Sequence, residues 1–270
     1  MTSSLPRVLI HCGVQKTAST AFHHFVQRNR DLLSRSVDIR TPVKGSPTRE
    51  LGRVAALFSL DDTHEADLIA RVTQVRDAVL SEGKPCVLSH ENIPGAMLGR
   101  GGVVTLYPEI ERILDLFVRH LAPLRPEFVF YTRDMAAWKV SVHNQAVKSD
   151  GYGETLDTFL EQTRACGTWD DLQARVAAVV GAERTHFLRL EEEENRAKPG
   201  MQLLRLARVP DADIRAMAEQ QGRRNESLNA GSLEFLRQLN QQGLPRAARK
   251  PVVQLIQGNQ ALFVPELDRV

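Results

Sequence analysis

Four short runs of apolar residues along the chain have the pattern of strands buried on both faces. They are Val8–Cys12, Pro85–Ser89, Glu127–Thr132 and Thr185–Leu190. Continuous apolar runs, rather than strict alternation with polar residues, are typical of central strands in parallel sheets, because helices cover both faces there. The pattern therefore predicts a parallel sheet of about four or five strands.

Between these runs, apolar residues recur at the spacing of amphipathic helices. The clearest stripes are Leu68, Ile69, Val72, Val75, Val79 and Leu80, then Ile110, Ile113, Leu114, Phe117, Val118 and Leu121, then Leu172, Val176, Val179 and Val180. The first stripe follows a start signal at residues 61–63, and Gly181 ends the last one. Residues 211–270 read as mostly helical without a clear strand. The alternation predicts one α/β domain spanning residues 1–270, with three α/β/α layers and a helical C-terminal part.

Composition narrows the classes of function. The chain has 35 Lys and Arg against 33 Asp and Glu, and this near balance argues against nucleic acid as a partner. The three cysteines have no metal-type spacing and read as reduced, buried thiols. Neither a signal peptide nor an apolar segment of about 20 residues is apparent, so we expect a cytoplasmic protein without a membrane span.

The first apolar run leads into a loop with the residues of a phosphate site. The segment HCGVQKTASTAFHH passes from a strand through a turn at Gly13 into a helix, whose N-terminal N–H groups suit an anion. Lys16 supplies a cation, and Thr17, Ser19 and Thr20 supply hydroxyl groups. A loop for ATP with magnesium needs G-x-x-x-x-G-K-[ST], which the spacing from Gly13 to Lys16 does not provide.

The segment QKTASTAF resembles the 5′-phosphosulfate loop of the PAPS-dependent sulfotransferases, usually written PK[ST]GTT, and is most similar to the bacterial HKTGTT form. Gln15 replaces the usual Pro or His, and Ala18 replaces the Gly. Ala18 keeps a backbone N–H donor but disfavours φ > 0. The resemblance implies a P-loop-nucleotide-kinase-like fold, 3′-phosphoadenosine 5′-phosphosulfate (PAPS) as donor, adenosine 3′,5′-bisphosphate (PAP) as product, and no metal.

A second motif follows the third apolar run, in YTRDMAAWKVSVHN. Arg133 stands at the strand end and Ser141 follows it by two helical turns, so both side chains can reach one phosphate. This separation is similar to that of the 3′-phosphate motif of the same family. Taken alone, the pair could equally be an Arg–Asp contact at a helix start with Ser141 as filler. His11, His23, His24 and Trp138 read as wall or packing residues.

The candidate general base follows the second apolar run, in VLSHENIPG. His90 resembles the catalytic His of cytosolic sulfotransferases, and Glu91 resembles the Glu of bacterial members and of enzymes acting on sugars. Either side chain can accept the proton of an acceptor hydroxyl, with a slight preference for His90. Farther along, Arg223, Arg224 and Asn225 could close over the 3′-phosphate, although a helix cap at Asn225 or Ser227 explains that segment equally well. The run Glu191–Glu194 reads as a solvated helix start.

These residues predict a transferase that moves a sulfuryl group from PAPS to a hydroxyl or amine of a small molecule or glycan. Lys16, with His90 or Glu91 and Ser141, would carry the chemistry; Arg133 and Arg224 would bind the 3′-phosphate. Residues 40–62, 92–106 and 144–155 read as loops forming the acceptor walls, and stretches 41–47 and 94–102 as surface loops. With 6% aromatic residues, a polar acceptor such as a sugar is favoured. The alternatives are a kinase with a degenerate phosphate loop and a non-catalytic nucleotide-binding protein; the oligomeric state has no sequence signal.

Overall fold

A parallel sheet lies at the centre of the protein, in a computed structural model that describes residues 5–220 and 228–264. Within these residues the strands are β1 Val8–His11, β2 Asp38–Arg40, β3 Cys86–Ser89, β4 Glu127–Thr132 and β5 Thr185–Arg189. They lie in the order β2-β3-β1-β4-β5, and every neighbouring pair is parallel. The predicted α/β class and parallel sheet are confirmed.

The four apolar runs correspond to β1, β3, β4 and β5, with ends that differ by one residue or none. The apolar pattern missed β2, a three-residue strand beside β3. Two of its three residues are charged, and Arg40 pairs with Asp38 and with Glu82. An edge strand is covered less than a central one, so its sequence carries no continuous apolar run.

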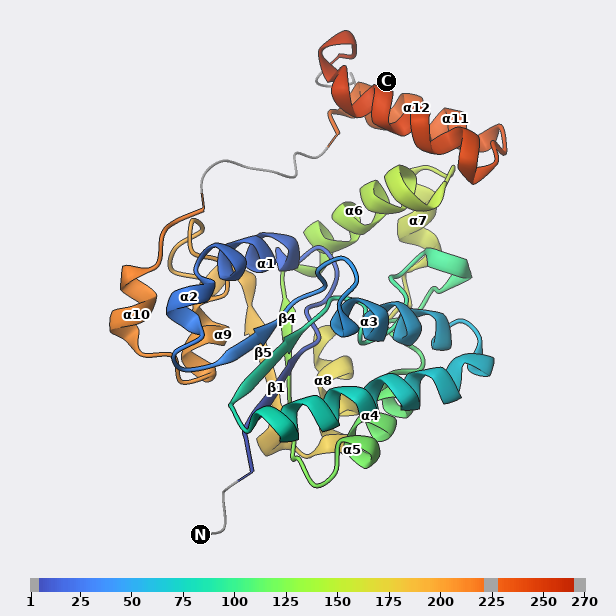
Figure 1. Cartoon of the computed structure of the whole chain (residues 1–270). Helices are drawn as coiled ribbons and strands as arrows, with labels where there is room; N and C mark the ends of the chain where they lie inside the picture. The colour runs from blue at the N-terminus through green and yellow to red at the C-terminus, as the bar shows by residue number, and fades with distance from the viewer. Residues whose placement is uncertain (1–4, 221–227, 265–270) are drawn as a thin grey trace.

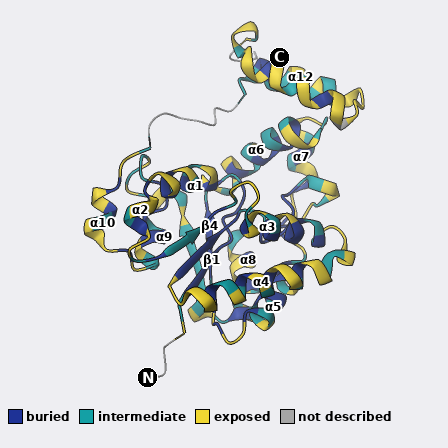
Figure 2. Ribbon diagram, viewed as in Figure 1, coloured by how far each residue is buried: buried dark blue, intermediate teal, exposed yellow. Residues whose placement is uncertain are grey.

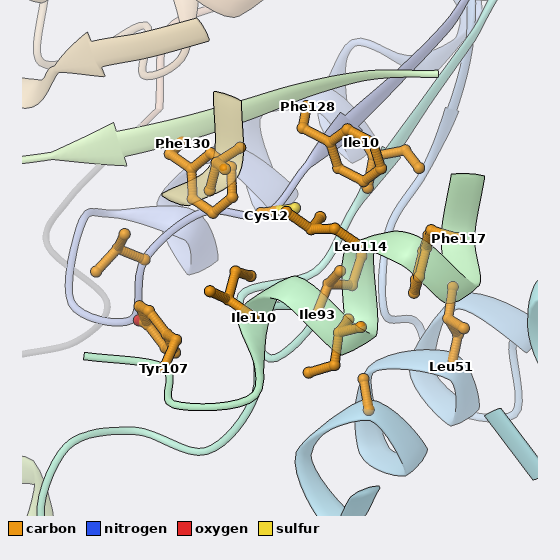
Figure 3. Close-up of a cluster of buried hydrophobic side chains, with 14 of the residues drawn as sticks. Ile10, Cys12, Leu51, Ile93, Tyr107, Ile110, Leu114, Phe117, Phe128 and Phe130 are labelled. Atoms are coloured by element: carbon orange, nitrogen blue, oxygen red, sulfur yellow. The ribbon is translucent and has the colours of Figure 1, made fainter. Parts of the chain in front are cut away.

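Helices cover both faces of the sheet (Figure 1). On one face Leu9, Val87, Val129 and Tyr131 pack in a core with α1 Ser19–Arg28, α2 Arg30–Leu33, α9 Met201–Leu206 and α10 Asp211–Ala216. On the other face Val8, Ile10, Cys86, Leu88, Phe128 and Phe130 pack with α3 Pro47–Phe58, α4 Glu65–Glu82, α5 Ile110–Leu121 and α8 Trp169–Val180. Figure 3 shows Ile10, Phe128 and Phe130 near Ile110, Leu114 and Phe117 of α5. The alternation of side chains along each strand therefore produces the predicted three layers.

The three apolar stripes form α4, α5 and α8, as predicted. Gly181 follows α8 at φ 91°, and its N–H donates to Ala177 O. A short 3-10 turn, Asp62–His64, precedes α4, with Asp61 at its cap. The prediction of loops over 40–62 was wrong, because α3 fills residues 47–58. Ser46 caps that helix by accepting from Arg49 N, and Pro47 occupies the first turn, where its missing N–H costs nothing.

The prediction of a surface loop over 94–102 was also wrong in part, because residues 93–98 are buried. Ser59 Oγ accepts from Ala96 N at 2.8 Å, and the Gln15 side chain donates to Gly95 O at 3.1 Å. Gly95 and Pro94 indicate a turn, but they do not indicate whether the turn lies outside or beneath other elements.

The described C-terminal residues form α11 Ala230–Gln241 and α12 Arg246–Gly258, in agreement with the predicted helical part. This pair packs on the end of α6 Met135–Gln145, which lies near α7 Leu156–Gln162 (Figure 1). Val147, Leu236 and Ile256 form a small cluster of their own, separate from the two main cores. Much of α12 is exposed (Figure 2).

All three cysteines are free and buried, as predicted. In the described part of the chain, no helix combines the length and the apolar character that a membrane crossing requires.

Candidate functional site

The site lies at the carboxyl edge of the sheet, where β1 and β4 are neighbours. The chain continues from β1 toward β2 on one side and from β4 toward β5 on the other. Ligands of open α/β sheets bind in the crevice at such a switch point. A cavity of about 1100 Å³ lies there, with walls from the loop after β1, the segment after β3, α6 and its extension, the segment after β5, and α11.

The loop between β1 and α1 requires a glycine at position 13 for lack of space. A Cβ at Gly13 would lie 2.7 Å from Ser19 Oγ and 2.8 Å from His11 Nε2. Ser19 and Thr20 face the cavity, and Ser19 Oγ is buried without a hydrogen-bond partner among the described residues. Thr17 is turned the other way, since its buried hydroxyl donates to Val14 O at 2.5 Å. Thr17 therefore fastens the loop, while Ser19 and Thr20 lie where a ligand can reach them.

Two residues of this loop adopt a left-handed backbone conformation. Lys16 has φ 70°, and Ala18 has φ 66° and ψ 17°. A left-handed non-glycine residue costs about 1–2 kcal/mol, because Cβ crowds the carbonyl oxygen. The Gly of the family motif thus corresponds to a real conformational requirement, and Ala18 meets it under strain.

Gln15 anchors the loop after β1 through hydrogen bonds to neighbouring segments. Its side chain is buried, with Nε2 donating to Asn92 Oδ1 at 3.2 Å and to Gly95 O at 3.1 Å, while Oε1 accepts from the Tyr107 hydroxyl. Its backbone carbonyl accepts from Trp138 Nε1 at 2.7 Å. These bonds join the loop after β1 to the segment after β3 and to α6. Gln15 therefore has a structural role in fixing the loop after β1.

Lys16 lies within a group of positive charges. Its Nζ lines the cavity and donates to Gln145 Oε1 at 3.2 Å. Burial lowers the pKa of Lys16, and the charges of Lys148 and Arg133 lower it further. Among the described residues, no carboxylate forms an ion pair with any of these three cations. Like charges that are partly desolvated and close together repel each other, so an anion bound among them would be strongly favoured.

Arg133 and Ser141, which the spacing predicts to reach one phosphate, differ in their relation to the cavity. Ser141 lines the cavity from α6. Arg133 Nη1 donates to Lys16 O at 3.4 Å, and Arg133 Nε is buried with no partner in the described structure. The Arg133 side chain is not on the cavity wall, so the structure brings it to the back of the phosphate-type loop.

The two candidate bases lie in different surroundings. The His90 ring is buried against α3, so closely that a Cβ on Gly52 would lie 2.3 Å from it. His90 Nδ1 accepts from Asn92 N at 3.1 Å, and burial lowers the His90 pKa. Glu91 lines the cavity, and its buried Oε2 has no hydrogen-bond partner among the described residues. The structure thus places Glu91, and not His90, on the wall.

A buried histidine network beneath the loop was not foreseen from the sequence. Ser89 Oγ lies 2.8 Å from both His11 Nδ1 and His23 Nε2. Burial lowers the pKa of His11 to about 3. Burial is also the largest cause of the lowered pKa of His23, which is about 4. His11 and His23 are packing residues and His24 lines the cavity, in agreement with the predicted wall or packing roles. The sequence contains a signal for this network, because His11 and Ser89 lie at the ends of two apolar runs that form neighbouring strands.

The prediction of a loop over 144–155 was wrong in part, because α6 and a turn of π-helix, Ala146–Asp150, cover residues 144–150 and present a polar face beyond Ser141. Asn144, Gln145 and Lys148 line the cavity and follow Ser141 at helical spacing. The helical spacing from Ser141 indicates that these residues share its face of α6.

The remaining candidates lie apart from the cavity or outside the described residues. Arg223, Arg224 and Asn225 are not among the described residues. The prediction of a helix start at Glu191–Glu194 was wrong, because only a 3-10 turn, Leu190–Glu192, forms there and α9 begins at Met201, whose N–H donates to Glu193 at 3.1 Å. Glu191 accepts from Asp134 N at 2.8 Å, at the start of α6.

A comparison with models of protein families finds no match for this chain, and a comparison with curated protein sequences finds none either. The resemblance to sulfotransferases rests on the motifs around Lys16 and Arg133.

The left-handed conformation of Ala18 predicts a stabilising substitution. Ala18→Gly removes about 1–2 kcal/mol of backbone strain from the folded state. It also gives the unfolded chain more conformational entropy, which lowers the free energy of unfolding by about 0.4–1 kcal/mol. Because Ala18 is exposed and loses little packing, we expect a net gain of about 0.5–1 kcal/mol in the free energy of unfolding, measured in urea. Ala21→Gly, inside α1, is the matched control and should lose about 1 kcal/mol. Equal losses in both variants would contradict the left-handed assignment.

The buried histidines predict acid sensitivity. Since His11 and His23 have lowered pKa values when folded, the unfolded chain binds more protons below pH 6.5. The free energy of unfolding should fall from pH 6.5 to 5, by up to about 1.4 kcal/mol per pH unit for each histidine that stays neutral. Urea unfolding at several pH values measures this slope, and His11→Asn should reduce it. A slope of zero in the unchanged protein over this range would rule out the effect.

Proposed function

We propose that the protein is a sulfotransferase that uses PAPS as donor and a hydroxyl or amine of a polar molecule, with carbohydrates as first candidates, as acceptor. One observation carries the proposal: Lys16 and Ser141, from the two halves of the switch point, face one cavity, and neither Lys16 nor Lys148 on its wall forms an ion pair within the described part of the chain. This arrangement suits a ligand with several negative charges and a ribose-sized body.

The polar groups that lack partners fit such a donor. The loop around Lys16, with Ser19 and Thr20, would hold the 5′ end, and Ser141 would hold the 3′-phosphate. Among the described residues Arg133 Nε has no partner and Nη1 donates to Lys16 O at 3.4 Å, so in this proposal the guanidinium, which does not line the cavity, turns toward the 3′-phosphate when the donor binds. Arg224 remains a proposed contact to the 3′-phosphate that lies outside the described residues. The bound donor supplies an activated sulfuryl group.

Two residues of the wall have the chemistry that transfer requires. In this proposal Glu91 accepts the proton from the acceptor hydroxyl or amine as its oxygen or nitrogen bonds to sulfur. Lys16 neutralises the charge that develops on the departing phosphate oxygen, a type of interaction worth about 3–4 kcal/mol in comparable sites. His90 acts through packing, because its Nδ1 is occupied by Asn92 N. Within the segments proposed as acceptor walls, the residues that reach the cavity are Asn92, Met97, Arg100, Asn144, Gln145, Lys148, Ser149 and Asp150.

The first prediction concerns which nucleotide binds. PAP should raise the melting temperature by about 5–10 °C at 100 times its Kd, corresponding to about 2.7 kcal/mol of linkage stabilisation. ATP with magnesium should give a much smaller shift, because the loop lacks the glycine spacing of an ATP loop. A larger shift with ATP and magnesium would favour the kinase. Binding of PAP without transfer to any acceptor would favour the non-catalytic protein.

The second prediction separates the candidate bases. Glu91→Gln should lower transfer by about 100-fold or more while PAP binding stays within twofold, since a proton acceptor contributes about 10²–10⁴ to rate. His90→Asn should keep most of the activity, because an Asn carbonyl can still accept from Asn92 N. The measurement is release of PAP from PAPS with a panel of carbohydrate acceptors. Glu154→Gln, an exposed carboxylate outside the cavity wall, is the control. The reverse pattern would assign the base to His90.

A further inference from the structure

Helix α6 does not stop at Gln145 but continues as one turn of π-helix, Ala146–Asp150. Lys148, Ser149 and Asp150 of this turn line the cavity together with Gln145. π-helical turns are rare and are frequent at functional sites, because the extra residue redirects side chains. Here the turn carries α6 past Ser141 and along the wall that faces Lys16.

The backbone of this turn is held by the C-terminal helices. Arg249 of α12 is 8% exposed, and its guanidinium donates to Val147 O, to Lys148 O at 2.8 Å and to Ser149 O at 3.3 Å. Asn240 of α11 accepts from Arg249 Nε at 2.7 Å and donates to Val147 O at 2.8 Å. A guanidinium has five donors in a fixed plane, so one side chain can fix three successive carbonyls.

The same turn is connected to Lys16. Gln145 Oε1 accepts from Lys16 Nζ at 3.2 Å, and Gln145 Nε2 donates to Ser149 Oγ at 2.6 Å. Lys148 therefore lies less than one helical turn beyond Gln145, the residue that contacts Lys16. Its charge is close enough to lower the pKa of Lys16, and among the described residues neither ammonium group pairs with a carboxylate. A phosphate or sulfate group between the two would relieve this repulsion.

We infer that Lys148 is a second anion-binding residue of the cavity and that Arg249, although on the C-terminal helix, positions it for that role. The inference rests on the proposed function, because the anion it requires is a phosphate or sulfate group of the donor or product. The α11–α12 pair is then part of the nucleotide site. Leu233 of α11, which lies on the cavity wall, is consistent with this placement.

A double-mutant cycle with PAP as the probe tests the coupling in the full-length protein. Lys148→Gln should weaken PAP binding about tenfold, the size of one charge-assisted hydrogen bond, as measured by calorimetry. Arg249→Gln should weaken it about fivefold in the unchanged background but less than about twofold when Lys148→Gln is already present. The matched control is Arg237→Gln, which removes a bond from α11 to Gly153 O but none to residues 147–149; it should leave the Kd unchanged.

A second measurement uses only the unchanged protein and does not depend on Arg249→Gln folding. Saturation with PAP should slow amide hydrogen exchange in residues 146–150 and in α12 as well as in the loop after β1. Protection confined to that loop and α6, or additive losses in the cycle, would overturn the role of Lys148 and Arg249 while leaving the proposed function intact. Failure of the unchanged protein to bind PAP would overturn both.

Discussion

The geometry of the site depends on how firmly the loop after β1 is held. Lys16 and Ala18 both adopt left-handed conformations, which an isolated loop would rarely populate. The buried Gln15 opposes this cost through hydrogen bonds to Asn92, Gly95 and Tyr107, while Trp138 binds its carbonyl. Because these partners come from the segments after β3 and from α6, the same contacts that fix the loop also align the other walls of the cavity.

The second constraint is electrostatic. Lys16, Lys148 and Arg133 are gathered at the switch point without a described carboxylate to pair with them, although acidic and basic residues nearly balance over the whole chain. Such an arrangement lowers the stability of the free protein, and in the proposed function a bound anion would restore this free energy. An anion bound among these charges would account for two observations: Arg133 Nε has no partner among the described residues, and Arg249 fixes the turn that carries Lys148.

Central strands and amphipathic helices were predictable because their apolar patterns are decided locally, as β4 and α5 show. Strand β2 was not predictable, since a three-residue strand at the edge of the sheet needs no apolar run. A strand end and a helix spacing led to Ser141, which lines the cavity, and to Arg133, which does not, so their shared contact with one phosphate stays a prediction. The direction of a side chain was not predictable, because Glu91 faces the cavity while the His90 ring packs into the space that Gly52 leaves on α3, a helix that the sequence analysis predicts as a loop.

In the proposed function, one cavity holds both phosphates of a 3′,5′-bisphosphorylated nucleoside. Calorimetric binding of PAP compared with adenosine 5′-monophosphate tests it most directly, at a fixed salt concentration. With Ser141 and Arg133 engaging the 3′-phosphate, PAP should bind at least about tenfold tighter, the value of one charge-assisted contact. Equal affinity for the two nucleotides would contradict the account, because the loop after β1 alone would then explain all of the binding.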